Sequence, residues 1–237
     1  MAALASTIAA DDWSIEQLFG AIAAYEPALL DLIWHFLFVP CVEATNGKQP
    51  YIQVLPEPGT RTVKPKAFCG NTAVRWVIVG PKVTHLGGWA FYRCTGLTEV
   101  TLPPGLTHLG DGAFYGCTGL TEVTLPPALT RVAGWAFCGC AGLTQVTLPP
   151  ALTHLGDAAF QNCEGLTEVT LPPTLTHLGE WAFYRCTGLT EVTLPPGLTH
   201  LGHRAFYGCA ELMEARVPEG FAVPDDAFPD CMRVVRS

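Results

Sequence analysis

The chain has 237 residues, of which 49% are hydrophobic and 14% are charged, and its formal net charge is −8. This composition excludes a disordered chain, and no apolar run reaches the roughly 18–20 residues needed to span a bilayer. The acidic balance also argues against nucleic acid as a partner, because phosphate binding needs a basic surface.

The first segment, residues 1–14, lacks the basic and apolar regions of a secretory signal. This favours an intracellular, cytoplasmic protein, whereas a secreted or surface location applies if the chain is a fragment. No sequence signal for oligomerisation is evident, and we expect a monomer.

Residues 1–50 predict a helical N-terminal cap. Ser14 to Gln17 form a capping box before apolar residues at helical spacing. Pro27 begins a second helix, which Pro40 ends. A helical pair that covers the first turn of a repeat array is the simplest interpretation. The alternative is a docking module, since residues 26–37 faintly resemble the start of an F-box, with the apolar positions one residue early.

From about Tyr51 to the C-terminus, residues 51–237, the chain repeats one 23-residue unit about eight times. The aligned copies start at Tyr51, Val74, Leu97, Leu120, Leu143, Leu166, Leu189 and Leu212. The last copy is degenerate and loses one residue. A unit this short cannot bury its own apolar side, so the copies must stack into a solenoid.

Each copy predicts one short strand followed by turns. In the clear copies, apolar residues at positions 1, 4 and 6 alternate with polar residues at positions 3 and 5. A proline pair ends the strand, and glycines near positions 14 and 23 allow turns. An acidic residue such as Asp111 or Asp157 is predicted to cap a short helical turn, with Ala, Phe and Cys facing the core.

The motif LxxVxLPxxLxxLGxxAFxxC at this period resembles the BspA-like (Treponema-type) leucine-rich repeat family over residues 51–237. The resemblance implies a leucine-rich repeat solenoid with short parallel strands on the concave side and turns and short helical segments opposite. It also implies protein or ligand binding, and many members are surface adhesins. The family has no catalytic residues or cofactor to transfer.

The first candidate site is the outward face of the strands, because equivalent residues of stacked coils form straight rows about 5 Å apart. These residues are Glu99, Thr101, Glu122, Thr124, Gln145, Thr147, Glu168, Thr170, Glu191 and Thr193. On a concave face they would form an acidic, hydroxyl-lined groove for a basic protein. The alternative is an ordinary solvated strand face.

Trp89, Trp135 and Trp181 form a second candidate site, in alternate coils. They are either exposed aromatic anchors for a partner or packing residues, each covering a smaller residue in a neighbouring coil, with Arg204 as the exception. We favour packing.

Two further rows invite a chemical interpretation. A histidine row, interrupted by Arg131, suggests a metal site or a pH sensor, but we interpret it as an outward polar row. It consists of His85, His108, His154, His177 and His200. A cysteine row suggests disulfides or zinc, but we predict buried free thiols beside the phenylalanines. It consists of Cys94, Cys117, Cys140, Cys163, Cys186 and Cys209.

An enzyme is disfavoured by the repetition itself. Residues 89–110 and 181–202 are identical, whereas a reaction centre requires unlike groups that converge in one place. We therefore expect a non-enzymatic protein-binding module that uses its strand face, without a metal or cofactor. The alternatives are a surface adhesin that binds a host protein or other ligand, and a ubiquitin-ligase adaptor.

Overall fold

The structure is a computed structural model that describes residues 51–54, 61–229 and 233–236, all within one compact unit, Glu43–Ser237. The predicted helical cap and the F-box-like segment lie outside the described residues and stay predictions. Within the described residues the regular structure is entirely β-strand, and no helix is long and apolar enough to cross a membrane.

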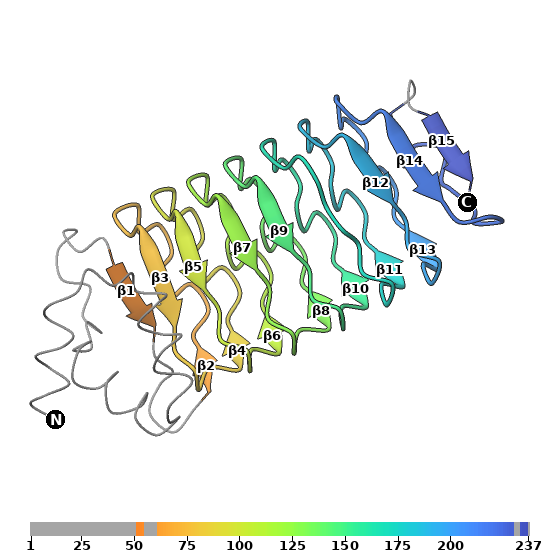
Figure 1. The fold of residues 1–237 in the computed structure, drawn as a ribbon. Helices are drawn as coiled ribbons and strands as arrows, with labels where there is room; N and C mark the ends of the chain where they lie inside the picture. The colour runs from red at the N-terminus through yellow and green to blue at the C-terminus, as the bar shows by residue number, and fades with distance from the viewer. Residues whose placement is uncertain (1–50, 55–60, 230–232, 237) are drawn as a thin grey trace, which may run out of the picture. The chain divides into compact units, whose positions relative to one another are not determined.

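Each typical coil contributes two strands, so two parallel ladders run along the array (Figure 1). The longer strands are β1 (Tyr51–Val54), β3 (Trp76–Val79), β5 (Glu99–Thr101), β7 (Glu122–Thr124), β9 (Gln145–Thr147), β12 (Glu191–Thr193), β14 (Glu214–Val217) and β15 (Arg233–Arg236). The shorter strands are β2 (Thr62–Val63), β4 (His85–Leu86), β6 (His108–Leu109), β8 (Arg131–Val132), β10 (His154–Leu155), β11 (His177–Leu178) and β13 (His200–Leu201). The longer ladder contains the strand predicted for each copy, whereas the shorter ladder is a second strand per coil that the repeat pattern does not predict.

The strand register follows the 23-residue period through the middle of the array. Val100 lies opposite Val77, and Val123 lies opposite Val146. The first strand departs from it, because Tyr51 pairs with Trp76 rather than with Val74. The predicted start of the first copy at Tyr51 is therefore wrong as far as the strand register is concerned. In the sixth coil, residues 167–170 follow the same path without forming a regular strand.

The core is a continuous stack of phenylalanine rings. Neighbouring rings are nearly parallel, with centroids 5.1–5.4 Å apart. The stack consists of Phe68, Phe91, Phe114, Phe137, Phe160, Phe183, Phe206 and Phe228. Burying one such ring contributes about 1.5–3 kcal/mol. The last ring follows 22 residues after the one before it, which confirms the predicted one-residue loss in the final copy.

The cysteine row is buried and free, as the sequence predicts. Each thiol donates to the carbonyl oxygen of a phenylalanine in the preceding coil; Cys117 Sγ, for example, lies 3.1 Å from the Phe91 oxygen. Burial raises the pKa of Cys94 and of Cys209 to about 12. These thiols are therefore packing groups that stay protonated rather than nucleophiles.

The segments opposite the longer strands are turns, so the short helical segments expected there are absent from the described residues. Two residues in each typical coil have a left-handed backbone; Trp89 has φ 59° and Arg93 has φ 53°. Their amide groups donate to the next coil, as Trp89 N does to Asp111 O at 2.8 Å. A helix needs a run of consecutive right-handed residues, and the left-handed residues interrupt any such run. Bonds within a coil, such as that from Tyr92 N to Trp89 O at 3.1 Å, therefore close single turns rather than a helix.

Candidate functional site

The longer strands present an acidic row to solvent, and all ten residues predicted for this face are exposed. Register places Trp76 opposite Glu99, Glu122 opposite Gln145, and Glu191 opposite Glu214. Within the described part of the chain, no hydrogen bond or ion pair is made by the side chains of Glu99, Glu122, Glu168 and Glu191. Like charges in adjacent strands repel, so this face retains an unfavourable interaction that a cationic partner would remove.

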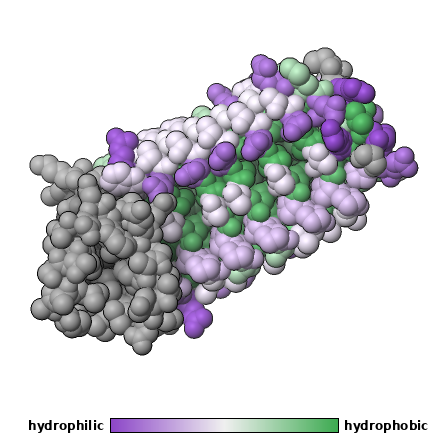
Figure 2. Space-filling model, in the orientation of Figure 1, coloured by the Kyte–Doolittle hydropathy of each residue, from purple (hydrophilic) through white to green (hydrophobic). Residues whose placement is uncertain are grey.

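The two ends of the acidic row differ from its middle, which the repeat pattern alone did not reveal. At one end Trp76 is 47% exposed in the position that the glutamates occupy elsewhere. At the other end Arg216 Nε pairs with Glu214 Oε1 at 3.1 Å. Figure 2 shows strongly hydrophilic residues gathered in a row along the array, with paler and hydrophobic surface beside it. The two ends of this acidic face therefore differ from each other, with an exposed indole at one end and an ion pair at the other.

The three tryptophans do not form one patch. A Cβ on Gly112 would lie 2.5 Å from two ring carbons of Trp89, so this indole covers the glycine of the next coil, as predicted. It also contacts Tyr92 and Tyr115, with ring centroids 5.5 and 5.6 Å away. By contrast, Trp135 and Trp181 are 43% and 39% exposed.

The histidine row lies on the shorter ladder, and four of its members are held by the preceding threonine. Thr153 Oγ1 donates to the Thr130 carbonyl oxygen at 3.0 Å and lies 2.8 Å from His154 Nδ1. The same pairs form between Thr84 and His85, Thr107 and His108, and Thr176 and His177. Each of these threonine hydroxyls thus lies between a carbonyl oxygen and Nδ1, and it orients the imidazole so that Nε2 is left without a partner among the described residues.

The imidazoles stack on one another where they are adjacent. The ring centroids of His85 and His108 are 4.0 Å apart, and those of His154 and His177 are 4.4 Å apart. Burial, the charge of Arg131 and the proximity of His177 lower the pKa of His154. Among the described residues no group of three or more His, Cys, Asp or Glu side chains can hold a metal ion.

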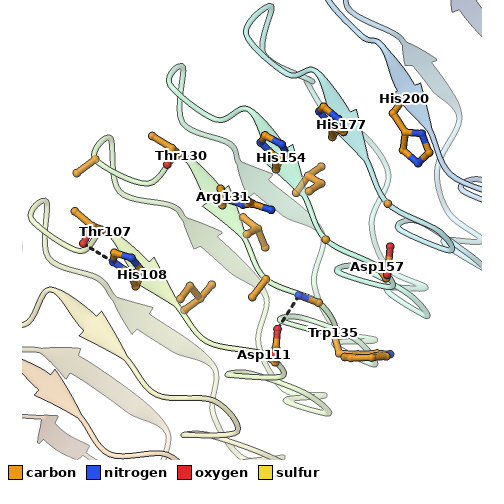
Figure 3. Close-up of a pocket in the computed structure, with 18 residues that line it drawn as sticks. Thr107, His108, Asp111, Thr130, Arg131, Trp135, His154, Asp157, His177 and His200 are labelled. Atoms are coloured by element: carbon orange, nitrogen blue, oxygen red, sulfur yellow. Dashed lines mark hydrogen bonds between the residues drawn. The ribbon is translucent and has the colours of Figure 1, made fainter.

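A groove of about 850 Å³ runs along the shorter ladder (Figure 3). Its lining spans five coils, from Thr107 to His200. One side carries the histidine row with Arg131 in it, and across from this row lie Asp111, Asp157 and Trp135. The repeat pattern predicts the histidine row and the tryptophan but not their proximity, because positions 12 and 16 of a copy share no simple periodicity.

Both aspartates in the groove link adjacent coils by hydrogen bonds and do not cap a helical turn. Asp111 Oδ1 accepts from the amide of Gly134 at 3.1 Å, and Asp157 Oδ1 accepts from the amide of Glu180 at 2.9 Å. Each bond joins one coil to the next. The second carboxylate oxygen of each aspartate has no partner among the described residues.

The family model that matches this chain is the BspA type leucine-rich repeat region, which matches six copies over residues 52–140 and 108–234. No curated protein matches the chain.

Solved structures show the same fold. A leucine-rich cell surface protein from Faecalibacterium prausnitzii is 30% identical with a TM-score of 0.63, covering 70% of this chain and 47% of that one. A leucine-rich repeat protein from Eubacterium ventriosum is 25% identical with a TM-score of 0.65, covering 75% and 47%. A third, from Bacteroides ovatus, is 22% identical with a TM-score of 0.54, covering 75% and 57%. The chain thus spans about half the length of these solved chains.

Proposed function

Because the chain belongs to the BspA-type leucine-rich repeat family, we propose that it is a non-enzymatic module that binds a basic protein on its strand face. The observation that carries this proposal is the row of exposed, unpaired glutamates on the longer strands, Glu99, Glu122, Glu168 and Glu191. A partner with lysines or arginines at a similar spacing would relieve the repulsion within the row and gain opposite-charge contacts.

We further propose that the module works at a cell surface, as an adhesin does, rather than in the cytoplasm. The support is the likeness to the Faecalibacterium prausnitzii structure, which is described as a leucine-rich cell surface protein. Buried free thiols are compatible with this location, because they are shielded from oxidants and disulfide exchange. Protease treatment of intact source cells tests the location, because surface protein is digested while a cytoplasmic control is not.

The binding face is tested by affinity capture with the intact chain and a variant carrying Lys in place of Glu99, Glu122, Glu168 and Glu191. A matched control carries Lys in place of four exposed acidic residues elsewhere, Glu164, Glu211, Glu219 and Asp225. Both variants change the net charge by the same amount. Partners lost with the strand-face variant and kept with the control support the proposal. Partners unaffected by the strand-face variant refute it.

A further inference from the structure

The groove on the shorter ladder has no role in the strand-face proposal, yet it is a concave surface of about 850 Å³ built entirely from described residues. Five coils line it, which corresponds to roughly 20 Å at the spacing of adjacent strands. It is long and open rather than a closed chamber (Figure 3). A ligand that fills it must be extended and must offer similar groups at regular intervals.

The groove offers polar atoms without a partner along both sides. The imidazole Nε2 atoms of His108, His154 and His177 make no hydrogen bond within the described residues, and in a neutral ring such an atom either donates or accepts. Across from them, Asp111 and Asp157 each present one carboxylate oxygen without a partner among the described residues. The ligand therefore needs donors for the carboxylates and, for the imidazoles, groups that can both donate and accept.

Donors are concentrated where the histidine row is interrupted. At this coil the Thr–His pair is replaced by Thr130 and Arg131, and neither side chain makes a hydrogen bond or ion pair within the described part of the chain. Both are exposed. The centre of the groove thus holds a guanidinium and a hydroxyl, so the ligand must also supply acceptors.

The charge of the groove does not favour a polyanion. Two aspartates face one arginine, and the lowered pKa of His154 keeps that imidazole neutral at neutral pH. The remaining feature is apolar: Trp135, at the edge of the groove, is 43% exposed. An exposed indole beside polar groups suits a ligand that combines hydroxyls with a flat C–H surface.

We propose that this groove binds an extended, neutral polysaccharide, with about one sugar per coil and one pyranose face stacked on Trp135. The sugar hydroxyls donate to the carboxylates, accept from Arg131 and Thr130, and pair with the imidazole Nε2 atoms either as donors or as acceptors. An equatorially linked pyranose chain advances by about one strand spacing per sugar, so the same contacts can repeat from coil to coil.

The test is calorimetric titration of the full chain with neutral β-1,4-linked hexasaccharides, namely cellohexaose, xylohexaose and mannohexaose. Trp135→Ala is expected to weaken binding about tenfold or more, as loss of an aromatic anchor does. The matched control is Trp181→Ala. Trp181 occupies the same repeat position with a similar φ and similar exposure, but does not line the groove. It is expected to leave binding unchanged within about twofold.

Arg131→His is a second variant that preserves folding, because histidine occupies this position in the neighbouring coils. It restores an uninterrupted row and is expected to weaken binding about fivefold or more by removing the central cation. His85→Arg, which introduces the same cation into the row outside the groove, is expected to have no effect.

Three outcomes overturn the proposal. These are no binding of any neutral hexasaccharide, equal weakening by Trp135→Ala and Trp181→Ala, and binding of hexagalacturonate or a neutral six-residue peptide at least as tightly as the neutral sugars. Because the strand-face glutamates do not line this groove, the four-lysine variant should bind the sugar normally. Failure of this proposal is thereby distinguishable from failure of the strand-face proposal.

Discussion

Residues 89–110 and 181–202 are identical in sequence, yet the structure gives them different surfaces. The indole of Trp89 is half-buried over Gly112, whereas Trp181, opposite which the next coil has Arg204, is 39% exposed. The histidine near the end of each block also differs in its stacking. His108 stacks on its neighbour at 4.0 Å, while the rings of His177 and His200 are 5.9 Å apart and tilted.

The cores of the two blocks are alike. Phe91 and Phe183 are both fully buried, and each stacks on the next ring at 5.2 Å. Cys94 and Cys186 each donate to a phenylalanine carbonyl oxygen, at 3.2 and 3.1 Å. A copied sequence therefore reproduces its core, which depends on positions shared by every coil. Its surface depends on the particular residues of the adjacent coil.

The largest expected loss of stability tests whether the cores of the two identical blocks are equivalent. Phe91→Ala and Phe183→Ala should each lower the free energy of unfolding by about 3–5 kcal/mol, because each leaves a cavity in the ring stack. The two losses should agree within about 1 kcal/mol, as expected of equivalent sites. Urea unfolding followed by circular dichroism measures both. Losses in the free energy of unfolding that differ by clearly more than this would show that the two phenylalanines are not equivalent.

The second prediction removes the difference between the neighbours of Trp89 and Trp181. Gly112→Arg gives the first block the neighbour that the second block has. A Cβ there would lie 2.5 Å from the Trp89 ring, and the backbone has φ 58°. We expect a loss of about 2–3 kcal/mol from left-handed strain and lost packing. Urea unfolding measures the loss, and a red-shifted tryptophan emission should accompany it. Unchanged stability and emission would contradict the role assigned to Gly112.

The reverse exchange, Arg204→Gly, should have a smaller and favourable effect. Arg204 has φ 52°, a conformation that glycine adopts without strain. We expect a gain of up to about 1 kcal/mol, because the exposed ion pair with Asp226 contributes little. Thermal unfolding gives the gain. Loss of stability would show that Arg204 packs favourably where it stands.

The smallest effect concerns the histidine row. His154 lies beside Arg131, and its folded-state pKa is lowered, so the unfolded chain binds a proton more readily than the folded one. This contribution to stability is present above the ordinary pKa of about 6.5 and is lost as the pH falls through it toward the folded pKa. His154→Gln should flatten the decline of stability from pH 7 to pH 5. Arg131→Gln should raise the His154 pKa in an NMR titration, and an unchanged pKa would argue against the assigned cause.

Much of this structure is predictable from the sequence because the repeat makes equivalent positions recognisable. Phe91 and Cys94 are assigned to the core by recurrence alone, and Glu99 to the outward face by alternation along the strand. The shorter ladder is not predictable in this way, since a two-residue strand such as His154–Leu155 is too short to show alternation. Left-handed tryptophans also contradict ordinary residue preferences.

The solenoid, its period and its core follow from the repeat pattern alone, because a short unit with a repeated apolar pattern can bury its apolar side only against copies of itself. The tertiary structure alone decided the surfaces. It exposed Trp181 and not Trp89, and it bonded the threonine beside each of four histidines to a carbonyl oxygen of the preceding coil. It also placed Arg131 in a groove with Asp111 and Trp135. The physical reason is that these contacts join residues about one period apart, so they exist only after the coils have stacked.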